Sequence, residues 1–481
     1  MAPMLEGIYS EPSIGTFSLI ISHDHSQIPI ILAKSLLYTE LCSFTDCLIT
    51  ALKRIHIWRG SLMWKYKCKS QFFSLIGAFI IGFAMTMFFS SNDLFQSIIN
   101  ETMPAAVVTV FESNPWLIGV SGGLGFAGLL NVFLIGSLIS SKYPGTMYLF
   151  MLAAIMLPDY AISLGMFALP IMIVVDLYGW ISLNLQTKRG YSKANISGDD
   201  EIVRIYLLHH KLDPKYEAVA EDTKKTLFKV NLAYILGLVA VFCAMFFLEN
   251  LFISMLLVLV CIFAFQYLAR IRASSYNSIA SILINECNPE GCLSALIYMS
   301  KSGSHYKIKN RALFAQCLIY LNEPSLAQDV LIAFPRSTTN NLMAYYSLMG
   351  YIYYLLKDEN GLNRCKEEMT NLRPQLGAMG MMVKSEELAA LENKINLMKG
   401  DFNTCKKYYL NLLKRSMTNL QKSDCEYYIA LISFVQRDYV IAKMYFEKVL
   451  ETGNKLYFVR NAKNYLKKID ESHLLEADDF S

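Results

Sequence analysis

The chain has 481 residues, of which 54% are hydrophobic and 17% are charged, and its formal net charge is +4 at pH 7. A typical soluble domain has about 45–50% apolar and about 25% charged residues, so these averages indicate an apolar half joined to a water-soluble half. The small net charge, without a basic stripe, excludes an electrostatic footprint for nucleic acid, and 11 scattered cysteines do not form a disulfide framework.

The N-terminal segment, residues 1–62, shows neither sustained helical nor strand periodicity. It has no basic start followed by an apolar run and a small-residue cleavage site, so no signal peptide is evident. Met63 then opens Met-Trp-Lys-Tyr-Lys-Cys-Lys directly before an apolar run. We expect residues 1–62 to be poorly ordered or absent from the native protein. His23 and His25 alone do not make a metal site, and we expect no metal or other cofactor.

Residues 63–270 form the predicted membrane domain, because they contain apolar runs near the length of about 20 residues that a spanning helix needs. The stretch 146–184 is too long for one span and is broken at Pro158-Asp159, so we predict that it crosses twice or re-enters. The expected passes are 72–89, 116–140, 146–157, 160–184, 228–248 and 251–268.

Loop charges give the direction of these passes, since cytoplasmic loops collect lysine and arginine. Three lysines, at 65, 67 and 69, precede the first pass, whereas residues 90–115 contain no basic residue. The loop 185–227 is again rich in lysine and arginine. We therefore expect an integral protein of a bacterial cell membrane, with both termini cytoplasmic.

Three small residues, Gly119, Gly123 and Ala127, recur every four positions and so lie on one face of the second pass. Such a face lets another helix approach closely, which predicts helix packing there and offers a contact for a homo-oligomer. The spacing Gly123-x-Gly125-x-x-Gly128 also matches the dinucleotide-binding motif, but that motif needs a preceding strand, and a membrane span excludes it.

The segment Gly119-Val120-Ser121-Gly122 resembles the G-x-S-G motif of rhomboid-type intramembrane serine proteases. The resemblance implies Ser121 as a nucleophile, activated by a histidine on a later span. No histidine lies in any expected span, so an active protease or an inactive relative stays an alternative function. Another alternative is a small transporter that uses Asp176, because carboxylates within a membrane are costly and often functional.

The water-soluble half repeats a small residue followed four positions later by a large one, which places both on one helix face. The pairs are Ala327/Leu331, Cys365/Met369, Cys405/Tyr409 and Ala442/Phe446. They recur at intervals of roughly 40 residues and resemble the tetratricopeptide repeat, a helical hairpin of about 34 residues. The best unit is Asp424–Gly453, with turn residues Arg437-Asp438 before its second helix.

These patterns predict an all-α protein in which a polytopic transmembrane helical domain precedes a cytoplasmic α-helical solenoid of tetratricopeptide-like repeats. The solenoid covers residues 305–470, after a helical adaptor at 271–304 and before an acidic tail at 471–481.

A solenoid of this kind presents a concave face to segments of partner proteins. Carried over from the aligned units, that face includes Lys309, Gln316, Tyr354, Lys394 and Tyr427. Since no catalytic motif is complete, we expect a non-enzymatic, membrane-anchored platform for protein interaction or assembly. Its expected partners are unidentified proteins on the repeats and the lipid bilayer around the spans, without nucleic acid.

Overall fold

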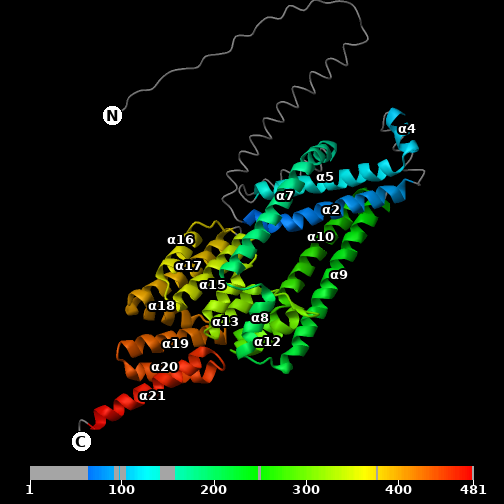
Figure 1. The fold of residues 1–481 in the computed structure, drawn as a ribbon. Coiled ribbons are helices and arrows are strands. Elements are labelled where there is room, and N and C mark those ends of the chain that lie inside the picture. The colour runs from blue at the N-terminus through cyan, green and yellow to red at the C-terminus, as the bar shows by residue number, and fades with distance from the viewer. Residues whose placement is uncertain are drawn as a thin grey trace, which may run out of the picture. The chain divides into compact units, whose positions relative to one another are not determined.

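The computed structural model describes residues 63–90, 97, 105–140, 158–247, 251–374 and 377–478, and this part is almost entirely helical (Figure 1). Residues 63–481 form one unit by their contacts. The all-α class is confirmed, with apolar helices in the N-terminal half and a repeat-like C-terminal region. The segment 1–62 and the expected pass 146–157 lie outside the described residues.

The N-terminal half contains three helices that are long and apolar enough to cross a membrane, counted over the described residues. They belong to α2 (Met63–Phe89), α5 (Trp116–Ser140) and α7 (Pro158–Lys193), and α4 (Ala105–Ser113) lies just before α5. Many of their large apolar side chains face outward, including Phe73, Ile80, Phe88, Phe167 and Val174. Exposed apolar surface of this extent is typical of a lipid-facing surface rather than a water-facing one.

The directions of α2, α5 and α7 follow from the residues that meet. Gly123 of α5 lies against Phe79, and Gly119 lies against Phe83, so α5 runs antiparallel to α2. Gly125 lies near Ile162, and the Asn131 amide donates to the Gly165 carbonyl at 2.9 Å, so α7 runs parallel to α5.

The two remaining expected passes fall on α9 (Glu217–Phe247) and α10 (Leu251–Ser274). These helices form a hairpin in which the Tyr234 hydroxyl donates to the Phe265 carbonyl at 3.1 Å, with the two rings stacked 5.6 Å apart. That both cross a membrane stays a prediction.

The C-terminal half is a series of helical hairpins in which each helix packs on the next in the chain. The hairpins are α13 (Arg311–Tyr320) with α14 (Pro324–Ile332), α15 (Thr339–Leu355) with α16 (Glu359–Thr370), α17 (Gly377–Lys399) with α18 (Phe402–Lys414), and α19 (Asn419–Val435) with α20 (Tyr439–Thr452). The last helix, α21 (Tyr457–Asp478), packs on α20 and runs into the segment expected as an acidic tail.

The turn inside each hairpin has a recurring local chemistry. A residue with positive φ ends the first helix at Asn322, Lys357, Gly400 and Arg437. In three hairpins the following aspartate side chain, at 358, 401 or 438, accepts a hydrogen bond from a backbone N–H of the second helix. Such N-caps satisfy amides that a helix leaves without partners, so the turns help to set where each second helix begins.

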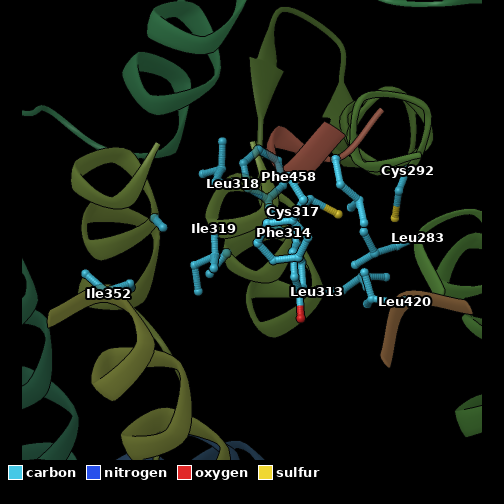
Figure 2. Close-up of a cluster of buried hydrophobic side chains, with 14 of the residues drawn as sticks. Leu283, Cys292, Leu313, Phe314, Cys317, Leu318, Ile319, Ile352, Leu420 and Phe458 are labelled. Carbon is cyan, nitrogen blue, oxygen red and sulfur yellow. The ribbon is translucent and has the colours of Figure 1, made fainter. Parts of the chain in front are cut away.

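The small and large residues of the sequence pattern all lie in the interior. The four small members are 0–5% exposed, and the four large members are 0–2% exposed. Figure 2 shows the centre of this hydrophobic core, where Phe314 and Cys317 of α13 lie among Leu283, Leu420 and Phe458. The core therefore joins the start of the repeats to their end.

The segment between α7 and α9, which is the middle of the loop expected at 185–227, packs against the repeats. It contains α8 (Asp199–His209) and the short helix η1 (Pro214–Tyr216), and Ile202, Val203 and Tyr206 are buried in the same core. The adaptor contributes α11 (Asn277–Ile284), α12 (Pro289–Ser300) and a small hairpin of β1 (Lys301–Ser302) and β2 (His305–Tyr306). The domain that contains the repeats is thus assembled from segments on both sides of the α9–α10 hairpin.

Candidate functional site

A tyrosine-lined site lies where the first helices of successive hairpins meet. The Lys394 ammonium of α17 lies 3.9 Å from the ring centre of Tyr351, 5.7 Å from that of Tyr354 and 5.8 Å from that of Tyr428. Only 8% of Lys394 is exposed. Aromatic faces attract cations electrostatically, and the attraction strengthens when water is removed, so these rings stabilise the buried charge.

Asp424 of α19 supplies the negative charge of the site. Its Oδ1 accepts a hydrogen bond from the Tyr351 hydroxyl at 3.0 Å, and that hydroxyl lies 3.3 Å from the hydroxyl of Tyr428. The Tyr428 ring is in turn stacked on Tyr409 at 4.9 Å. Asp424, Tyr351 and Tyr354 are only half-buried, so the site reaches the surface.

The electrostatics of the two charged groups are coupled. Burial lowers the pKa of Lys394, and the carboxylates of Asp424 and Glu387 oppose that change. Burial raises the pKa of Asp424, whereas Lys394 and the hydrogen bond from Tyr351 hold it down. Each group therefore favours the charged form of the other, as expected for two opposite charges in a partly desolvated site.

Helix caps fix two of the helices that carry these residues. Thr338 begins α15 and Thr418 begins α19, and each side-chain oxygen accepts a hydrogen bond from a backbone N–H in the first turn. A cap that sets the first residue of a helix also sets which face later residues occupy. Tyr351 and Asp424 are thereby directed toward the same space from two different hairpins.

The structure brings together three of the five residues predicted for the partner-binding face. Tyr354, Lys394 and Tyr427 all lie in this aromatic cluster, since Tyr427 and Tyr354 both contact Tyr428. Lys394 and Tyr427 are buried rather than open to solvent, which the sequence pattern did not indicate.

The other two predicted residues do not join the cluster. Lys309 is exposed in the segment before α13, and Gln316 is half-buried on α13. Sequence reasoning missed Asp424, Tyr351 and Tyr428. The signal available was the concentration of tyrosine at 345–354 together with the run Asp-Cys-Glu-Tyr-Tyr at 424–428.

The helix-packing residues of the membrane half lie at contacts within the chain. A Cβ atom on Gly119 would lie 2.7 Å from Phe83 and Met87, and one on Gly123 would lie 2.8 Å from the Phe79 carbonyl. Ala127 is 1% exposed, in a cluster with residues of α2 and α7. This face is therefore occupied by α2, and a homo-oligomer stays a prediction.

Ser121 lies on α5, where its side chain is exposed and its hydroxyl donates to the Ile118 carbonyl at 2.8 Å. No histidine lies on α2, α5 or α7. These three described helices therefore provide no histidine to take the serine proton, which is the role that the rhomboid-type mechanism gives to a histidine.

Asp176 lies on α7, only 1% exposed, close to Cys68 of α2. Its Oδ2 makes no hydrogen bond within the described part of the chain. The neighbouring Gly179 allows α2 to approach, since a Cβ there would meet Cys68 and Trp64. If this candidate span crosses a membrane, a carboxylate in it is energetically costly, which makes Asp176 a candidate functional residue.

Over the residues that the structure describes, no group of three or more histidine, cysteine, aspartate or glutamate side chains could hold a metal ion. Comparison of the chain with protein-family models, with curated proteins and with solved structures finds no match. The assignment of function therefore depends on the geometry of the chain itself.

Proposed function

We propose that this protein is a membrane-anchored interaction platform whose helical repeats bind a segment of a partner protein. The observation that carries the proposal is the tyrosine-lined site around Lys394 and Asp424. It is built by α15, α17 and α19, the first helices of three successive hairpins, and such helices present the binding face in helical-hairpin solenoids.

The chemistry of the site suits a peptide segment. Tyrosines are enriched among the residues that contribute most to protein–protein binding, because one side chain offers both apolar area and a hydroxyl. Asp424 is half-buried, and its Oδ1 accepts a hydrogen bond from the Tyr351 hydroxyl. We expect the bound segment to present a basic or amide side chain to Asp424.

The repeats are of the tetratricopeptide type in this proposal. The support is the series of hairpins, three of which have a capped second helix, and all four of which have a buried small-large pair in the second helix. The proposal also keeps the repeat domain in the cytoplasm, which the positively charged loops favour.

The test uses the full-length protein in its native membrane, with a photo-crosslinking amino acid at position 354. We expect a reproducible adduct with one protein, and we expect Asp424→Asn to abolish it. The matched control carries the crosslinker at Val440, which is 78% exposed on the second helix α20. If position 354 gives no adduct beyond those seen from position 440, the binding face has been assigned wrongly.

A transporter is a second candidate, because Asp176 is a buried carboxylate within a candidate span. The conservative variant Asp176→Asn keeps the shape and removes the charge. If vesicles with the native protein show solute flux and vesicles with this variant do not, transport is supported. If vesicles with the native protein show the same flux as protein-free vesicles, transport is excluded. The protease alternative has no comparable support, because the described helices α2, α5 and α7 carry no histidine that could act as the base for Ser121.

A further inference from the structure

A cavity of about 370 Å³ lies where the ends of α2 and α7 meet the repeat domain. Three cationic side chains line it: Arg189 and Lys193 of α7, and Arg336 from the segment between α14 and α15. Tyr66 of α2 and Tyr345 of α15 complete its polar and aromatic walls, and no carboxylate is among its described lining residues. The cavity therefore has the charge of a site for an anion.

Arg336 is held in place through its Nε and through the face of its guanidinium group. Its Nε donates to the Tyr66 hydroxyl at 3.0 Å, and its guanidinium carbon lies 4.5 Å from the ring centre of Tyr345. Within the described residues, no carboxylate pairs with Arg336, Arg189 or Lys193 at salt-bridge distance. A fixed guanidinium with two available nitrogens matches the geometry of a phosphate group.

The level of the cavity along the spans indicates the source of that phosphate. The candidate spans are Trp64–Phe89 and Tyr160–Lys193, and the cavity lies at the beginning of the first and the end of the second. At the same ends, Lys69 lies 5.6 Å from the ring centre of Trp180, and Lys65 donates to Ser182. Tryptophan and lysine gather at the level of lipid headgroups, so the cavity faces that layer of the membrane.

We propose that this cavity binds the phosphate headgroup of an anionic phospholipid. The phosphate pairs with Arg336, Arg189 and Lys193, while the polar side chains of Gln186 and Thr187 line the space for the rest of the headgroup. Basic pockets between membrane helices on the cytoplasmic side recognise anionic headgroups through the same charges. The bound lipid joins α2 and α7 to the repeat domain, because its partners come from both.

This assignment does not depend on what the repeat domain binds. It requires that α2 and α7 lie in a bilayer, and it concerns the end of the bundle rather than the tyrosine-lined site. Loss of partner binding and loss of lipid binding can therefore be observed separately in the same preparation.

The experiment measures lipid binding to the full-length protein by native mass spectrometry, during titration with phosphatidylglycerol or with phosphatidylcholine. We expect the native protein to prefer phosphatidylglycerol. The double variant Arg189→Gln/Lys193→Gln should weaken that binding by roughly fivefold for each charge removed. Arg336→Lys should also weaken it, because lysine keeps the charge but loses the planar pair of donors.

The matched control is Lys407→Gln/Lys414→Gln, which removes two exposed charges from α18 without touching the cavity. It should bind phosphatidylglycerol as the native protein does. Equal binding of both lipids by the native protein, or an equal loss in the control, would overturn the proposal. Competition by inorganic phosphate at the same affinity as the lipid would assign the cavity to a soluble anion and would overturn it as well. Circular dichroism of each variant confirms that the helices are retained.

Discussion

The α2–α5–α7 bundle and the repeat domain both pack helices through small residues, but they place different atoms against them. In the bundle, backbone meets backbone: a Cβ on Gly165 would collide with the carbonyl group of Gly128. In the repeats, the small residue is alanine or cysteine, and a large side chain four positions later fills the space beside it. Ala442 and Phe446 are an example, and both are fully buried.

The difference follows from the solvent of each region. Lipid tails are as apolar as leucine, so helices in a membrane associate through close packing and interhelical hydrogen bonds. The bonds from Asn131 to the Gly165 carbonyl and from Thr86 to the Gly119 carbonyl are of this kind. In water, burial of apolar area stabilises the fold instead. The bundle should therefore be damaged by added atoms, and the repeats by removed ones.

The largest expected effect is the removal of a core side chain from the repeats. Phe446→Ala leaves a cavity between α19, α20 and α21, where Phe446 stacks on Tyr465 at 5.2 Å. We expect the free energy of unfolding to fall by about 3–5 kcal/mol, which thermal unfolding of the detergent-solubilised protein would detect. The control Val440→Ala removes an exposed side chain from the same helix and should change little. Equal effects of both variants would contradict a core held by the small-large pairs.

A second test concerns the contact that ties the segment between α7 and α9 to the repeats. Arg311 pairs with both carboxylate oxygens of Asp199 at 2.6 and 2.8 Å, and both side chains are largely buried. Asp199→Asn leaves the guanidinium without its anion, which costs about 3 kcal/mol for a buried pair.

The expected readout is faster amide hydrogen exchange in α8 and around Ile308, whose N–H donates to Asp199. Glu221→Gln is the control, since the pair of Glu221 with Lys225 is exposed. Unchanged exchange in α8 would show that the apolar contacts of Ile202 and Val203 hold this segment without the ion pair.

The bundle is tested by adding atoms. Gly165→Val inserts a side chain where α5 and α7 are in backbone contact, and we expect a loss of about 1–3 kcal/mol. Unfolding in mixed detergent micelles measures it. Gly77→Val is the matched control, because a Cβ at Gly77 meets nothing within 4 Å. If both variants unfold alike, close approach of α5 and α7 does not stabilise the bundle.

Much of the fold could be predicted because its signals are local in the sequence. The pairs Cys405/Tyr409 and Ala442/Phe446 lie four residues apart, and helix geometry alone places each pair on one face. The predicted span 116–140 and the helix α5 have the same bounds, since a long apolar run has few alternatives.

The tyrosine-lined site was harder to predict from the sequence, because its contacts join residues that lie far apart in the chain. Tyr351 and Asp424 come from different hairpins, so no local pattern connects them. The segment 185–227 was interpreted as a loop because its charges dominate its composition. The apolar spacing of Ile202, Val203 and Tyr206 was a helical signal that this interpretation overlooked.

The smallest expected effect lies on α14, the repeat helix that contacts α7. Burial raises the pKa of Asp329 from 3.8 to about 6. Between about pH 4 and pH 6 the folded protein therefore binds more protons at this group than the unfolded chain does, so its contribution to stability falls as the pH rises.

Asp329→Asn removes this titration. We expect the variant to match the native Tm at pH 4 and to exceed it at pH 7. The corresponding gain in the free energy of unfolding should be less than about 1 kcal/mol, because the side chain is half-exposed. Asp222→Asn, on the exposed side of α9, serves as the control. A Tm difference for Asp329→Asn that is the same at both pH values would show that burial at this helix is too slight to shift the carboxyl group.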